Sequence, residues 1–194
     1  MIEMRKSLGI LSFSVLTLFI SCASRPQPVA QQPPANQSNQ DKPEFKLTST
    51  AFKEGLPIPS TYTCDGVNVS PPLEWSGMPK SAKSIAIIAD DPDAPGGMWV
   101  HWVLYNLPAD NIGLVENLPA TENLAAGGFQ GKNDFEKIGY GGPCPPSGTH
   151  RYFFKIYALD ADLSLKAGAS KAEVEKAMAG HIVAQAQLMG TYRR

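Results

Sequence analysis

The sequence has little net charge and no run of basic residues. Its 17 Lys and Arg residues nearly balance its 18 Asp and Glu residues, which leaves a formal net charge of −1. Because nucleic acid binding requires a dense positive surface, nucleic acid is not an expected partner. The sequence also lacks a Gly-x-Ser-x-Gly motif, so nothing indicates the sharp turn that carries the nucleophile of many serine hydrolases.

The sequence also lacks an apolar run long enough to span a membrane. A shorter apolar run near the N-terminus indicates a targeting segment. It covers 13 residues, 8–20, which is shorter than the roughly 20 needed to cross a bilayer as a helix. Positions 5 and 6 are basic, and this combination is typical of a signal peptide. The tetrapeptide FISC at 19–22 resembles the cleavage site of bacterial lipoproteins. The resemblance implies a lipoprotein signal peptide of residues 1–21, cleavage before Cys22 and acylation of Cys22.

A lipid on Cys22 would hold the chain at the bacterial cell envelope. By the same resemblance, an Asp after the cysteine retains lipoproteins at the inner membrane, whereas this chain has Ala23. The outer membrane facing the periplasm is therefore the expected location. The alternative is a secretory peptide cut at another position, which would leave Cys22 as a free thiol. Residues 22–43 hold five Pro, five Gln and no aromatic residue, so we predict a disordered tether followed by one domain over 44–194.

Cysteine is scarce, and its number suggests a disulfide. The chain has three cysteines, Cys22, Cys64 and Cys144. If Cys22 is acylated, an even pair remains in an exported protein that meets an oxidising compartment. Both remaining cysteines lie in turn-rich loops, so we predict a Cys64–Cys144 disulfide. The alternative is two buried, unpaired thiols.

Alternating patterns predict that most of the domain is β-structure. Strands are expected at 45–49, 84–89, 100–107 and 152–159, with Gly- and Pro-rich turns between them. Residues 110–140 are expected to form a long loop with one short strand.

The C-terminal region has helical patterns. Ser170 and Glu173 are spaced as a capping box at the start of a helix, and Gly180 is expected to end or bend that helix. Apolar residues at 182, 186 and 189 continue the helical spacing. The domain is thus predicted to be mainly β, with short C-terminal helices packed at one end.

Two stretches together suggest a binding site. Residues 139–154, GYGGPCPPSGTHRYFF, join a loop rich in Gly and Pro to a strand that places His150 and Tyr152 on one face. Residues 90–108, DDPDAPGGMWVHWVLYNLP, place Asp91 and Asp93 in a turn before a strand with a second histidine. If the stretches converge, imidazolium groups, the tyrosine hydroxyl and N–H groups of the loop would offer donors to a phosphate-like anion.

Each of these features also has an ordinary interpretation. Asp favours turns because its side chain bonds the backbone two residues on, and a histidine on an apolar strand is more often a core residue. On alternation, Trp99 and His101 share one face, where Trp99 could form an apolar wall. Carboxylates nearby would favour the imidazolium form of His101 and His150. Arg151 faces away from His150 and is expected to pair with a carboxylate.

Four motifs in order, YTCDGVNVSPPLEW, DDPDAP, HWVLYNLP and GPCPPSGTHRYFFKIYALD, resemble the phosphatidylethanolamine-binding protein (PEBP) family. The resemblance spans about residues 45–194 and is closer to the bacterial branch, often labelled Raf-kinase-inhibitor-like. It implies a β-fold of two antiparallel sheets with terminal helices and a small anion pocket. The pocket residues implied by the motifs are Asp91, Asp93, Pro95, Trp99, His101, Gly142, Pro143, His150 and Tyr152.

Three functions remain open on this basis. The first is a non-catalytic module that binds phosphate or an anionic head group, needs no cofactor or metal, and modulates a partner protein. The second, by resemblance to family members that restrain proteases or kinases, is an inhibitor whose target docks on surface loops. The third is a metal-dependent hydrolase, because two His and two Asp can coordinate a divalent cation. We favour the first, since a glycine-rich loop supplies donors that suit anions.

Overall fold

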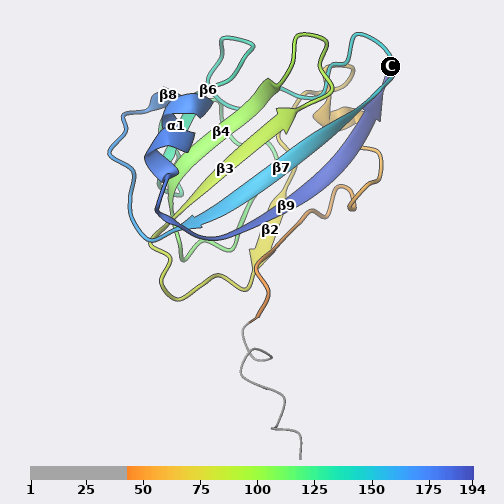
Figure 1. Ribbon diagram of the computed structural model, residues 1–194. Coiled ribbons are helices and arrows are strands. Elements are labelled where there is room, and N and C mark those ends of the chain that lie inside the picture. Colours follow the sequence, from red (N-terminus) through yellow and green to blue (C-terminus); the bar gives the residue numbers. More distant parts are fainter. Residues whose placement is uncertain (1–42) are drawn as a thin grey trace, which may run out of the picture. The chain divides into compact units, whose positions relative to one another are not determined.

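The computed structural model describes residues 43–194. The signal peptide, the acylation of Cys22 and the tether up to residue 42, all predicted from sequence, lie outside this range. Two β-sheets, one α-helix and one short 3-10 helix make up the described part (Figure 1). The elements are β1 (Lys46–Thr48), η1 (Ser60–Tyr62), β2 (Leu73–Ser76), β3 (Ser84–Asp91), β4 (Trp99–Pro108), β5 (Gly113–Leu114), β6 (Phe129–Lys132), β7 (Thr149–Leu159), β8 (Gly168–Ser170), α1 (Lys171–Met178) and β9 (Ile182–Arg193).

The strands form one large and one small sheet. Six strands make the large sheet in the order β8-β6-β4-β3-β7-β9, and three make the small sheet in the order β1-β2-β5. Neighbouring strands are antiparallel, except for β6 and β8, which pair in parallel. The predicted mainly β fold with two sheets is confirmed, and the four predicted strands correspond to β1, β3, β4 and β7.

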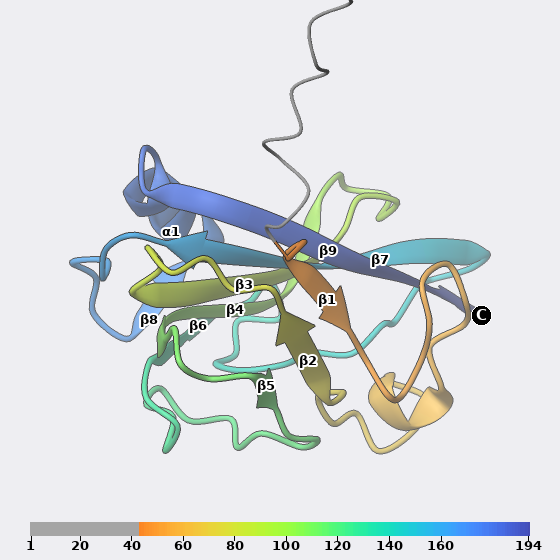
Figure 2. The same ribbon diagram turned by 90° about the horizontal axis from the view of Figure 1, so that it is seen from below.

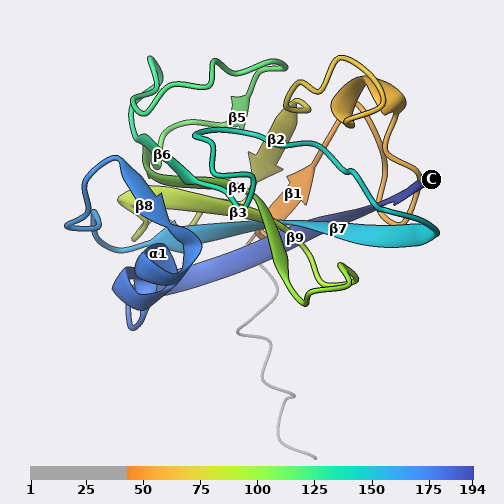
Figure 3. The ribbon, with the colours of Figure 1, turned by 90° about the horizontal axis from the view of Figure 1, so that it is seen from above.

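Packing on both faces of the large sheet produces two apolar cores. Figure 3 shows the small sheet on one side of the large sheet and α1 on the other, and in Figure 2 β1 and β2 run across the direction of β7 and β9. Trp102 and Phe154 belong to the core between the sheets, whereas Ile88 and Val174 belong to the core under α1. Being covered from both sides, β3 is buried along its whole length. Each large apolar side chain buried in this way contributes roughly 1.5–3 kcal/mol.

The prediction for the C-terminal region is correct for one helix and wrong for the segment that follows. The capping box is present, because Ser170 and Glu173 each accept from the other's backbone N–H. Beyond Gly180, however, the chain forms β9 and not a second helix. Pairing with β7 along almost its entire length outweighs a weak local helical pattern.

Two smaller observations complete the fold. Residues 110–140 contain two short strands, β5 and β6, where one was expected. No helix formed by residues 43–194 is long and apolar enough to cross a membrane.

Candidate functional site

Antiparallel pairing brings the predicted site stretches to one end of the large sheet. β3 ends at Asp91, which lies opposite Trp99 at the start of β4. On its other side β3 pairs with β7 in the same antiparallel sense. The end of β3 therefore meets the starts of β4 and β7, which carry His101 and His150.

These strand ends and the adjoining loops enclose a cavity of about 200 Å³, the first cavity. Some of the residues implied by the family resemblance line it: Asp91, Pro95, Trp99, His101 and His150. The lining residues that sequence reasoning did not select are Ala94, Phe135, Cys144, Pro145 and Pro146. All of these except Phe135 lie within or next to the DPDAP and GPCPP motifs, whereas Phe135 comes from the loop between β6 and β7.

A buried hydrogen bond to a carboxylate orients the histidine of β7. His150 Nδ1 lies 2.8 Å from Asp91 Oδ2, and the two side chains are 9% and 4% exposed. Because a carboxylate only accepts, Nδ1 carries the proton in this bond. The second Asp91 oxygen accepts from the Asp93 N–H at 2.8 Å, so the carboxylate is held from two directions. The Nε2 atom of His150 makes no hydrogen bond to residues 43–194 and is free for a ligand.

A β-bulge positions the second histidine. Ala89 of β3 lies opposite Trp102 and Asp90 lies opposite Val100, so His101 between them has no partner on β3. Val100 packs in the core under α1, while Trp102 packs in the core between the sheets. The extra residue of a bulge redirects side chains locally, and here it lets His101 reach the first cavity next to Trp102.

The charged form of His101 is disfavoured, contrary to the prediction from nearby carboxylates. Burial lowers the pKa of His101 below its usual value, although the Gly141 carbonyl and the Asp91 charge act in the opposite direction. The cost of desolvating a charged ring therefore outweighs the attraction of the carboxylate. Nδ1 of the ring donates to Gly141 O at 2.6 Å, which leaves Nε2 as a hydrogen-bond acceptor.

Tyr152 packs against both imidazoles and has a buried hydroxyl. Its ring centroid is 5.2 Å from that of His101 and 6.5 Å from that of His150. The hydroxyl is buried and has no hydrogen-bond partner among residues 43–194. Burial first, and then the neighbouring Asp91 charge, raise the pKa of Tyr152, so the hydroxyl keeps its proton. The hydroxyl is close enough to the Asp91 side chain and the Cys144 backbone for both to affect its pKa, and Tyr152 is not among the residues that line the first cavity.

Asp93 faces Arg151 instead of the first cavity. Arg151 donates to the Asp93 carboxylate from Nε at 2.9 Å, from Nη2 at 2.7 Å and from its backbone N–H at 3.0 Å. These bonds, the side-chain one foremost, lower the pKa of Asp93 from 3.8 to about 2. The expectation that Arg151 pairs with a carboxylate is confirmed.

Gly142 and Pro143 support the loop and do not line the first cavity. The Gly142 N–H donates to Asn68 Oδ1 at 2.8 Å, and Pro143 O accepts from the Cys64 N–H at 3.0 Å. The Gly142 N–H is therefore already occupied and is not among the loop N–H groups available to an anion. A glycine is needed there for packing, since a Cβ would lie 2.4 Å from Tyr62 O.

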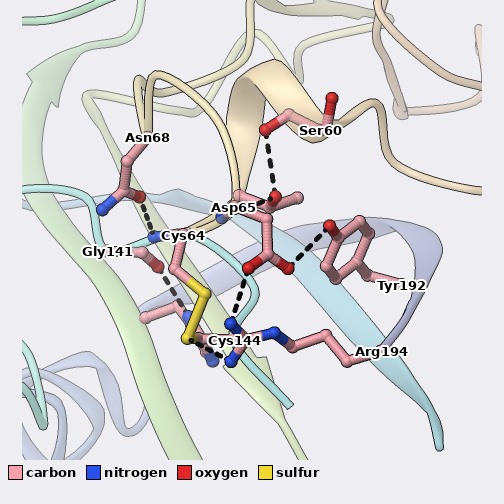
Figure 4. Close-up of a disulfide and its surroundings, with 11 residues drawn as sticks. Ser60, Cys64, Asp65, Asn68, Gly141, Cys144, Tyr192 and Arg194 are labelled. Carbon is pink, nitrogen blue, oxygen red and sulfur yellow. Dashed lines mark hydrogen bonds and ion pairs between the residues drawn. A yellow bond between two sulfur atoms is a disulfide. The ribbon is translucent and has the colours of Figure 1, made fainter.

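The predicted disulfide is present and joins two loops near the first cavity. Cys64 and Cys144 are bonded, with their Cα atoms 5.4 Å apart. Figure 4 shows Arg194 beside this bond, reaching Asp65 together with Tyr192. Arg194 Nη2 lies 2.6 Å from Asp65 Oδ1, and the Tyr192 hydroxyl donates to Asp65 Oδ2 at 2.9 Å. The end of β9 thus holds both loops that the disulfide connects.

Metal coordination finds no support in the side-chain arrangement. Within residues 43–194, no group of three or more His, Cys, Asp or Glu is placed to hold a metal ion. Asp90, which sequence reasoning did not single out, is fully buried but accepts from Lys155 Nζ at 2.8 Å and from Lys171 Nζ at 2.7 Å. This carboxylate anchors the start of α1 to the sheet.

Comparisons with known proteins agree with the fold and the motifs. A UPF0098 protein from Methanothermobacter thermautotrophicus is 56% identical over 150 residues, covering 77% of this chain and 99% of that protein. A crystal structure of a PEBP homologue from Chlamydia trachomatis has a TM-score of 0.72 and 45% identity, covering 78% of this chain and 98% of that one. The structure of E. coli YbcL, described as a new member of the mammalian PEBP family, has a TM-score of 0.72 and 36% identity, covering 78% and 99%. The family model described as phosphatidylethanolamine-binding protein matches residues 48–193, and the chain therefore belongs to this family.

Proposed function

We propose that this chain is a non-catalytic binding module whose first cavity takes a small phosphate-like anion. The observation that carries the proposal is the buried Asp91–His150 pair, which fixes one ring nitrogen and leaves the other for a ligand. In its protonated form His150 donates from Nε2 to an anionic oxygen, and charge-assisted bonds of this kind are the strong ones.

The neutral His101 adds a preference among anions. Its Nε2 accepts a hydrogen bond, which suits the P–OH group of a hydrogen phosphate or a singly protonated phosphomonoester. Sulfate carries no such proton near neutral pH and leaves that acceptor unused. Phosphate is therefore expected to bind more tightly than sulfate, because an unpaired buried acceptor costs roughly 1–3 kcal/mol.

The size and lining of the first cavity favour the binding of a small anionic head group without any reaction. The first cavity holds about 200 Å³, less than the ~300–1,000 Å³ typical of sites for drug-sized ligands. Its lining contains no free Ser, Thr, Lys or Cys nucleophile, since Cys144 is held in the disulfide. An acyl chain or other bulky substituent would remain outside.

Calorimetric titration of phosphate into wild type and His150→Ala tests the proposal. Loss of a charge-assisted bond worth ~1.5–3 kcal/mol should weaken binding roughly ten- to a hundredfold.

The matched control is His181→Ala. His181 also pairs with a carboxylate, Asp160, at 2.9 Å, but it precedes β9 at the opposite end of β7 from His150. Its removal should leave phosphate affinity unchanged. Equal phosphate binding by wild type and His150→Ala would refute the site. Metal-dependent turnover of a phosphoester that disappears in His150→Ala would instead support a hydrolase.

We also propose that the domain is held at the bacterial envelope through acylated Cys22. The support is the lipoprotein-like cleavage sequence and the Pro- and Gln-rich composition of residues 22–43. A tether of this kind would let the anion site reach ligands or a partner protein at a distance from the membrane surface.

A further inference from the structure

A second cavity of about 230 Å³ shares two walls with the first. Phe135 and the disulfide-bonded Cys144 line both cavities. Asn68, Lys137 and Tyr140 line the second cavity but not the first. The shared walls place the polar groups of one cavity next to those of the other.

Lys137 gives the second cavity an unpaired positive charge. Among residues 43–194, no carboxylate lies within 4 Å of its Nζ atom, while the acidic groups near it have other partners. Glu136, its neighbour in sequence, pairs with Lys132. Asp134 accepts from the Val100 N–H at 2.7 Å.

The side-chain amide of Asn68 adds a neutral donor. Its Oδ1 faces the Gly142 N–H at 2.8 Å, and because an N–H must face an acceptor, the amide orientation is determined. The Nδ2 group, turned away from this bond in Figure 4, makes no hydrogen bond to residues 43–194. Lys137 and Asn68 together offer donors to an anionic or strongly polar group.

One turn, held by Asn133, carries both Phe135, which lines the two cavities, and Lys137. The Asn133 Oδ1 atom accepts from the Phe135 N–H at 3.0 Å and from the Lys137 N–H at 3.1 Å. The ring of Phe135 in turn packs edge-on against His101, with centroids 5.3 Å apart. The position of Lys137 relative to the histidine of the first cavity is therefore held by the turn and is not left to a free loop.

We propose that the two cavities form one bipartite site for a bis-anionic small molecule. Its phosphate-like group occupies the first cavity, and a second anionic group, a carboxylate or another phosphate, reaches Lys137 and Asn68 over the edge of Phe135. This proposal rests on the anion site proposed above. It narrows the ligand class from any phosphate-like anion to one that carries a second negative charge a short distance away.

A ligand series with wild type and Lys137→Gln tests this geometry on the full chain. Phosphonoacetate, 3-phosphonopropionate and 4-phosphonobutyrate place a carboxylate at increasing distance from the phosphonate, and the matching alkylphosphonates lack it. In wild type, one member of the series should bind about three- to tenfold tighter than its alkyl analogue. The gain is modest because Lys137 is exposed and exposed ion pairs and single hydrogen bonds are weak.

Lys137→Gln should remove most of this gain without changing the affinity for inorganic phosphate. Lys80→Gln is the matched control, since it removes the same charge before β3, at the end of that strand away from Asp91, and it should keep the gain. If no carboxylate-bearing ligand exceeds its alkyl analogue while phosphate still binds, the bipartite site is refuted and the single anion site stands. An equal gain in wild type and Lys137→Gln refutes the role of Lys137. Absence of phosphate binding in every protein refutes both proposals.

Discussion

Reduction of the Cys64–Cys144 disulfide should destabilise the domain by several kcal/mol. The bond closes a loop with a sequence separation of 80 residues. In the loop-entropy model, a closure of this length removes about 4.5 kcal/mol of conformational freedom from the unfolded chain. For a domain of about 150 residues, each kcal/mol corresponds to roughly 2–4 °C in melting temperature. We therefore expect a fall of about 9–18 °C on reduction.

The reduced protein should still fold, because other contacts hold the same two loops together. The Cys64 N–H donates to Pro143 O at 3.0 Å, and the Gly142 N–H donates to Asn68 Oδ1 at 2.8 Å. These bonds connect the loops on either side of the disulfide. Since Cys144 lines both cavities, phosphate affinity should also decrease when the bond is opened.

Thermal unfolding followed by circular dichroism, with and without a dithiol reductant, measures the effect. A Cys22→Ser background leaves only Cys64 and Cys144 to titrate with a thiol reagent before and after reduction. The double variant Cys64→Ala/Cys144→Ala should melt near the reduced protein and be insensitive to reductant. Melting temperatures of the oxidised and reduced forms within about 2 °C of each other would refute the loop-entropy reasoning for this domain.

Two further predictions concern the lipid anchor proposed at Cys22 and the stability of the fold at low pH. Cys22→Ser should move the protein from the membrane to the soluble fraction; membrane retention of the variant, with no lipid mass on the wild type, would contradict acylation. The pKa of Asp93, about 2, lies below its usual value of 3.8, so the Asp93–Arg151 pair stabilises the fold above about pH 4 and loses this effect as pH falls towards 2. Because Arg151 is half exposed, we expect about 1 kcal/mol after solvent screening. Asp93→Asn should therefore melt roughly 2–4 °C below wild type at pH 7, with a gap that closes in acid; a gap independent of pH would contradict the pairing.

Strand pairing explains which parts of the fold were predictable from sequence. Segments that become β3, β4 and β7 carry dense apolar and aromatic patterns, and each was assigned correctly. β9 was not, because its residues 182, 186 and 189 also fit a helical repeat. The alternation of residues 184–188, AQAQL, fits a strand as well, and pairing with the edge of β7 decides between the two conformations.

The site shows the same division between local and long-range information. Alternation along β7 correctly placed His150 and Tyr152 on the inner face, away from Arg151. Phe135 escaped notice because it reaches the first cavity through a turn built on Asn133, with no strand pattern around it. Gly141 allows this approach, since a Cβ there would lie 2.6 Å from the Phe135 ring. Gly141 is therefore needed for the packing of a neighbouring side chain.

The two histidines differ in how they reach one cavity, and this difference accounts for their different chemistry. His150 lies on a regular strand opposite a carboxylate, so a charged ring has a partner inside the protein. His101 reaches the cavity only because a bulge adds a residue at that point of β4, and its ring nitrogen meets a carbonyl. Burial without a dedicated carboxylate disfavours the charged form of that ring. Two histidines that look equivalent in the motifs therefore meet different partners in the folded protein, a carboxylate for His150 and a backbone carbonyl for His101.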